Sequence, residues 1–131
     1  MVKQYLLDTN VLIAMFKGQH GIQEKMVAVG LQNCFVSEIT LAELYAGAYK
    51  SMRKDALRQV VFVRNNFGII PFDCAEVYGK LRSHLEAAGN RLDDMDLLIA
   101  STALDHGLTL VTNNTRHFSR VIGLEIEDWF E

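Results

Sequence analysis

Short apolar runs alternate with longer stretches of helical periodicity along the whole chain of 131 residues. Short apolar runs bounded by turn residues are typical of buried strands, and strands that alternate with helical patterns are typical of parallel sheets. The chain is therefore expected to adopt an α/β fold, a three-layer sandwich in which helices flank a central, mostly parallel sheet of about four to five strands.

Capping and turn residues set the expected limits of these elements. Thr9 or Asn10, Ser37, Asp73 and Asp93 are the expected helix starts, and glycines such as Gly89 and Gly107 are the expected stops. The strands are expected to close at residues 6–7 and to span 34–36, 67–71, 108–111 and, at the edge, 124–126. The helices are expected over residues 11–17, 19–33, 38–47, 53–66, 74–88 and 93–107.

Composition favours one globular domain over residues 1–131, since half of the residues are hydrophobic and only one is proline. The formal net charge of −3 gives no overall sign of nucleic-acid binding, so such binding would rest on local patches or on a metal. Cys34 and Cys74 have neither metal-ligand nor disulfide spacing and are expected to be buried thiols. Because the apolar start is too short for a signal peptide or a membrane span, we expect a cytoplasmic protein without membrane contact.

Three acidic residues stand in apolar surroundings, where an ionised carboxylate needs a compensating partner. Asp8 ends an apolar strand, and Glu43 and Asp96 each share a helix face with small or apolar residues. Separate explanations exist: Asp8 as a helix cap, Glu43 reaching solvent, and Asp96 in a first helical turn. A single metal site explains all three at once and is the preferred interpretation.

The position of these acids in the expected fold supports that interpretation. Ligands of parallel α/β sheets bind beyond the carboxyl ends of the strands, where Asp8 and Thr112 both stand. Oxygen-only ligands suit Mg²⁺ or Mn²⁺, and the four histidines lack paired zinc spacing. Such a site fits hydrolysis of a phosphodiester bond by a metal-activated water.

At this point the motifs resemble those of the PIN-domain ribonucleases, and more narrowly the VapC toxins of bacterial type II toxin-antitoxin pairs. The resemblance runs from Tyr5 to Trp129 and keeps the order of the motifs. The matching residues are Leu7-Asp8-Thr9-Asn10, Ile39-Thr40, Ala42-Glu43-Leu44, Gly47, Asp96, Ile99-Ala100, Val111-Thr112-Asn113-Asn114 and Phe118.

The resemblance implies a metal-dependent endoribonuclease with Asp8, Glu43 and Asp96 as catalytic metal ligands. Asn114 falls where many members have a fourth acid, and its amide oxygen would add a ligand without charge, so that one or two metals can be envisaged. Thr9 and Thr112 are expected to support the ligands. Asp93 either reaches the metal-bound waters or, as the preferred interpretation, caps its helix.

The resemblance also implies partners. These are an RNA substrate, often transfer RNA, a VapB-like antitoxin, a second copy in a homodimer, and a larger hetero-oligomer with the antitoxin. Phe16, Tyr45 and Tyr49 are candidates for a groove that receives an antitoxin helix, although aromatic residues at helical spacing are more often core. Basic residues at 50–64 and 116–120 are candidate RNA-backbone contacts, with a solvated helix face the preferred interpretation of the first group.

Two other functions are compatible with parts of the sequence. A non-catalytic PIN-like module that binds a protein partner through its groove would agree with the uncharged Asn114 and the net acidity. A phospho-acceptor receiver domain has the right length and a strand-end Asp8, but the chain lacks the adjacent acidic pair near Asp8 and a strand-end lysine after residues 108–111.

Overall fold

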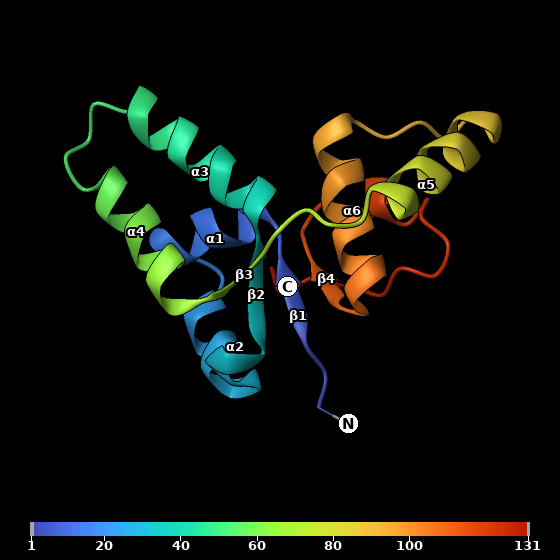
Figure 1. The fold of residues 1–131 in the computed structure, drawn as a ribbon. Coiled ribbons are helices and arrows are strands. Elements are labelled where there is room, and N and C mark those ends of the chain that lie inside the picture. Colours follow the sequence, from blue (N-terminus) through green and yellow to red (C-terminus); the bar gives the residue numbers. More distant parts are fainter. Residues whose placement is uncertain (1, 131) are drawn as a thin grey trace.

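The computed structural model describes residues 2–130 and contains a five-stranded sheet between two groups of helices (Figure 1). The strands are β1 (Tyr5–Leu7), β2 (Cys34–Ser37), β3 (Gly68–Ile70), β4 (Thr109–Val111) and β5 (Ile126–Glu127). The helices are α1 (Thr9–Phe16), α2 (Ile22–Val29), α3 (Glu38–Lys50), α4 (Ala56–Asn66), α5 (Ala75–Ala87), α6 (Asp94–His106) and the short α7 (Thr115–Phe118), with a 3-10 turn η1 (Leu31–Asn33).

The strand order is β3-β2-β1-β4-β5, and every pair of neighbouring strands is parallel in the described residues. The order reverses between β1 and β4, which makes the carboxyl ends of these two strands the topological switch point where α/β folds bind ligands. This order also differs from the 2-1-3-4-5 order of receiver-like sheets, so the receiver interpretation is set aside. The α/β three-layer prediction is confirmed.

Alternating strand residues build two cores, one on each face of the sheet. Leu7 and its neighbour Tyr5 pack with α1 to α4, whereas Leu6 points to the other face and packs with α5, α6 and α7. Val111 and Leu110 divide between the same two cores. This period of two is the expected behaviour of strands buried on both faces. No helix of the described residues is long and apolar enough to span a membrane.

Local hydrogen bonds explain where the helices begin differently from the prediction. The Asp8 carboxylate accepts a hydrogen bond from the Thr9 amide, so Asp8, and not Thr9 or Asn10, is the N-cap of α1. Asp73 does not cap α5, because its carboxylate pairs instead with His106 Nε2 at 3.0 Å. Ser37 caps α3 as predicted, by accepting a hydrogen bond from the amide of Ile39.

Glycines explain the other differences. The helix expected over residues 19–33 is divided, because Gly21 and Gly30 both have positive φ and bound α2. Conversely, α3 continues through Gly47 to Lys50, since one glycine inside a helix costs only about 1 kcal/mol. The helix expected from residue 53 begins at Ala56. The last long helix ends as predicted, with Gly107 in the left-handed conformation.

Candidate active site

Four elements meet at the switch point and bring the predicted acids together. Asp8 follows β1, and its backbone amide donates to the carbonyl of Val111, which extends the pairing with β4 by one residue. Glu43 lies in the second turn of α3, and Asp96 lies in the first turn of α6. The amino-terminal end of a helix favours negative charge, which helps to hold Asp96 at this place.

Asp8 is the most buried of the acids, with 6% of its surface exposed, and two neighbours hold its carboxylate. Thr112 Oγ1 donates to Asp8 Oδ2 at 2.8 Å, and the Thr9 amide donates to Asp8 Oδ1 at 2.9 Å. Burial raises the pKa of Asp8, while these two hydrogen bonds favour the charged form and oppose the rise. Asp8 is therefore a fixed carboxylate at the floor of the site.

Thr9 links Asp8 to the second acid. Its amide binds Asp8, and its side-chain Oγ1 donates to Glu43 Oε1 at 3.0 Å. The supporting positions predicted for Thr9 and Thr112 thus correspond to hydrogen bonds in the structure. Thr112 Oγ1 also accepts a hydrogen bond from the backbone amide of Asn114 at 3.0 Å, which ties the polar turn to the same network.

The neighbouring acids disfavour the charged form of Asp96. The pKa of Asp96 is raised to about 6, chiefly by burial and further by the charges of Asp8, Asp93 and Glu43. The side chain of Asp93 stands at the N-cap position of α6 but makes no capping hydrogen bond, so the expected capping role is not seen in the structure. Its charge instead acts on Asp96.

Asn114 and His117 form the outer wall of the site. Asn114 Nδ2 and His117 Nδ1 are 2.9 Å apart, and His117 Nδ1 lies 3.9 Å from Asp96 Oδ2. From the sequence, His117 was expected only as one of the RNA-backbone contacts at residues 116–120. Its approach to Asp96 depends on the short helix α7, which the hydrophobic pattern did not predict.

A different group of potential metal ligands lies away from this site. Within residues 2–130, Asp73, Asp105 and His106 are the group whose ligand atoms all lie within 4.8 Å of one another, and all three are exposed. They stand at the far end of α6 from Asp96. Asp8, Glu43 and Asp96 do not form such a group within 4.8 Å, so a cation held by them would keep several water ligands.

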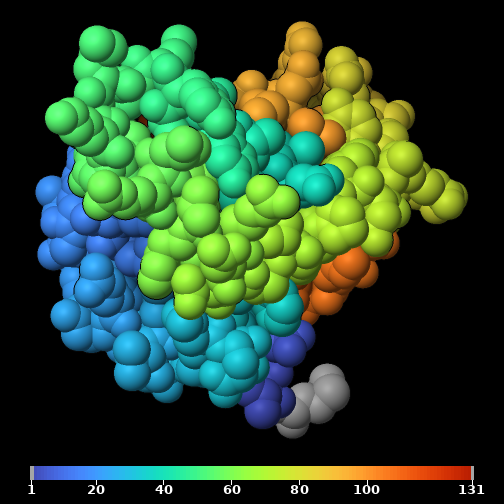
Figure 2. All heavy atoms as spheres, turned by 60° about the vertical axis from the view of Figure 1, so that its left-hand side comes forward, coloured from blue at the N-terminus to red at the C-terminus, as the bar shows by residue number. Residues whose placement is uncertain are grey.

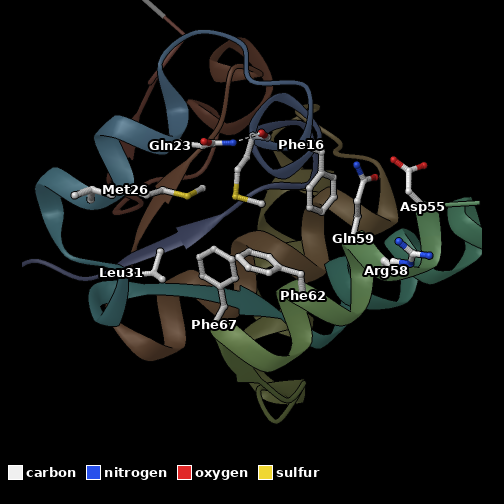
Figure 3. A pocket seen from close by; sticks show the side chains of 11 residues that line it. Phe16, Gln23, Met26, Leu31, Asp55, Arg58, Gln59, Phe62 and Phe67 are labelled. Atoms are coloured by element: carbon white, nitrogen blue, oxygen red, sulfur yellow. Dashed lines mark hydrogen bonds between the residues drawn. The ribbon is translucent and has the colours of Figure 1, made fainter.

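A second surface feature is an apolar groove of about 470 Å³ between α1, α2 and α4. Phe16, Met26, Phe62 and Phe67 point into it, and Asp55, Arg58 and Gln59 stand at one end (Figure 3). In Figure 2 the surfaces of these three helices adjoin on the same face of the molecule. Of the aromatic residues predicted for such a groove, Phe16 lines it, whereas Tyr45 and Tyr49 stack on each other along α3.

Comparison with known proteins shows the family to which this fold belongs. Residues 5–124 match the family model described as the PIN domain. The chain is also 36% identical to Ribonuclease VapC2 of Rickettsia felis, over 95% of this chain and 97% of that protein. The chain belongs to the PIN-domain family, in the VapC group. The tRNA(fMet)-specific endonuclease VapC of Shigella flexneri is 34% identical to this VapC-group chain. The match covers 96% of this chain and 98% of that protein.

Solved structures extend the similarity to the fold. The crystal structure of VapBC2 from Rickettsia felis, bound to a DNA fragment from their promoter, contains a chain that superposes with a TM-score of 0.88 at 35% identity. That match covers 95% of this VapC-group chain and 98% of the other. The DNA-bound VapBC from Salmonella typhimurium gives a TM-score of 0.85 at 32% identity, over 97% and 98% of the two chains.

Proposed function

We propose that this VapC-group chain is the toxin of a type II toxin-antitoxin pair, an endoribonuclease that hydrolyses RNA with Mg²⁺ or Mn²⁺. The observation that carries the proposal is the convergence of Asp8, Glu43 and Asp96 at the switch point of the sheet. Relatives named ribonuclease and tRNA-specific endonuclease support the catalytic interpretation over a non-catalytic binding module. Transfer RNA is accordingly the first substrate to test.

The donor set suits a hard divalent cation. Three carboxylates supply oxygen ligands. Burial and, after it, mutual repulsion raise the pKa of Asp96, and a cation between the carboxylates would relieve that repulsion. Asn114 can add a neutral amide oxygen on the side of Asp96. When bound, the cation supplies Lewis acidity toward the scissile phosphate and the attacking water.

The protein residues contribute position and charge. Thr9 and Thr112 hold the carboxylates of Asp8 and Glu43 through hydrogen bonds, so these ligands need little reorganisation when the cation and the RNA arrive. Asp93 adds negative charge beside Asp96. His117 and Asn114 are open to solvent at the rim, where an RNA phosphate would enter.

The test replaces Asp8 with its uncharged isostere. We expect Asp8→Asn to lower the cleavage rate of transfer RNA by roughly a hundredfold or more, because it removes a ligand charge from the site. A chelator should stop cleavage by the unaltered protein, and added Mn²⁺ or Mg²⁺ should restore it. Calorimetric titration should show that Asp8→Asn loses uptake of the ion, while circular dichroism shows a retained fold. Full cleavage by a folded Asp8→Asn protein would refute the proposal.

We also propose a VapB-like antitoxin as the partner, with an apolar segment of it in the groove between α1, α2 and α4. Two similar solved structures are VapBC complexes, and the groove has exposed apolar residues such as Val27 and Phe62.

A homodimer that joins the antitoxin in a larger assembly is the expected oligomer, and mass measurement in solution tests it. We place this activity in the cytoplasm, where RNA is present and the thiols of Cys34 and Cys74 stay reduced.

A further inference from the structure

A pocket of about 250 Å³ opens directly beside the acidic site, between α1, α3 and α4. Thr9 and Glu43, which belong to the hydrogen-bonded network of the acids, form part of its lining. The pocket is thus continuous with the place where the proposed function puts the scissile phosphate. The sequence did not predict this pocket, because its walls come from three segments between residues 9 and 60 that meet only in the folded protein.

The walls of the pocket are suited to a flat, weakly polar group. Ile13, Leu44 and Val60 supply apolar contact, while Gly47, Ala48 and Ala56 are small and leave the space open. A volume of about 250 Å³ exceeds that of a single nucleobase. Gln59 supplies an amide with both donor and acceptor groups, the type of side chain that reads the edge of a base.

Two exposed basic residues, Lys17 and Arg53, flank the same pocket. Lys17 stands at the C-cap of α1 and Arg53 in the loop between α3 and α4, and both bring positive charge near the carboxylate of Glu43. Arg53 Nη2 donates to Gln59 Oε1 at 3.4 Å, so the guanidinium stays close to the polar wall. Proteins that bind single-stranded nucleic acids combine apolar walls that hold a base with basic side chains that contact the phosphates.

We propose that this pocket receives one unpaired RNA base next to the scissile phosphate, while Lys17 and Arg53 contact neighbouring backbone phosphates. The inference rests on the proposed ribonuclease function and adds a determinant of sequence preference to it. A base can enter only when it is unstacked, so the preferred substrates are single-stranded loops or ends. A protein side chain from the antitoxin is the competing occupant.

Gly47 allows a direct test, because a Cβ added there meets no atom within 4 Å and the position is helical. Gly47→Leu would fill the pocket and should keep the helix, since leucine favours helices more than glycine does. Gly79→Leu is the matched control, as Gly79 is also helical, has the same free space and lies on α5, away from the pocket.

The measurement is cleavage of a short, unstructured RNA library with random bases around the cut. We expect Gly47→Leu to lower kcat/KM for the preferred sequences by roughly tenfold and to flatten the sequence preference, with Mn²⁺ uptake unchanged. Gly79→Leu should behave as the unaltered protein. In the Asp8→Asn background, Lys17→Ala and Arg53→Ala should each reduce the salt slope of RNA binding by about one.

Equal rates and equal sequence preference for the two leucine variants would overturn the inference. It would also be overturned if Gly47→Leu lost antitoxin binding while its cleavage pattern stayed the same. Failure of the proposed function is distinguishable: the unaltered protein would then cleave no RNA. The pocket would still be tested in that case by comparing RNA binding of Gly47→Leu and Gly79→Leu.

Discussion

At the scale of single residues, Asp96 is held in an electrostatically unfavourable state. Its side chain is 20% exposed, and burial with three neighbouring acids raises its pKa to about 6 from an ordinary value of 3.8. The unfolded chain gives up this proton at lower pH than the folded chain does. In the metal-free protein, ionisation of Asp96 therefore opposes folding, as expected for a group arranged to bind a cation.

The sign of this effect can be measured. As pH rises from about 4 to about 6, the folded protein retains a proton that the unfolded chain has lost, so the metal-free protein loses at most about 3 kcal/mol of stability through Asp96. Asp96→Asn should therefore be more stable than the unaltered protein at pH 7, and the difference should shrink toward pH 4. Urea unfolding in chelator at several pH values measures it, and a pH-independent difference would contradict the prediction. The same variant should lose RNA cleavage.

At the scale of elements, glycine decides where several helices end. Gly107 terminates α6 with φ of 65°, a conformation in which other residues are strained, and so allows the chain to enter β4. Gly79, by contrast, lies inside α5, where its conformational freedom only weakens the helix. The two positions should respond in opposite ways to the same substitution.

We expect Gly107→Ala to destabilise the protein by about 1 to 2 kcal/mol, because alanine is disfavoured in the left-handed region. Gly79→Ala should stabilise it by about 0.5 to 1 kcal/mol, since an added Cβ meets no atom within 4 Å. Thermal or urea unfolding of the two variants checks both values. A destabilised Gly79→Ala or a neutral Gly107→Ala would show that these backbone conformations do not control the helices.

At the scale of the whole molecule, the acidic site and the apolar groove are distinct, and the base pocket beside the acidic site shares Phe16 and Gln59 with the groove. The acidic site lies at the carboxyl ends of the strands, whereas the apolar groove lies between α1, α2 and α4 (Figure 3). An antitoxin segment in the groove would thus leave the metal ligands chemically intact. Partner binding and catalysis should then be separable by mutation.

Val27 is the residue with which to separate them, because it lines the groove and is 76% exposed. Val27→Glu should weaken antitoxin binding by roughly tenfold or more, since a charge would be buried in an apolar contact, and should leave RNA cleavage unchanged. Ile122→Glu is the control at a similarly exposed residue, 80%, outside the groove. Unchanged antitoxin affinity in Val27→Glu would place the partner elsewhere.

Much of this organisation was determined by local sequence. The alternation of apolar runs and helical patterns predicted the parallel sheet, and buried charge in apolar segments identified Asp8, Glu43 and Asp96 as unusual. Both signals depend on residues close together in the chain, where the period of burial and the cost of desolvating a carboxylate can be evaluated directly. Helix ends were predicted where one residue decides them, as at Ser37 and Gly107.

Tertiary structure decided what depends on distant residues. Asp8 caps α1 and also accepts a hydrogen bond from Thr112. His117 lies near Asp96, and Asp73 pairs with His106 and does not cap α5. The pocket beside Glu43 likewise exists only because α1, α3 and α4 pack together. The sequence by itself determined which residues are costly to bury. Packing decided which of these residues meet. The reason is that hydrogen bonds and electrostatic forces act over a few ångströms of space, however many residues separate the two groups along the chain.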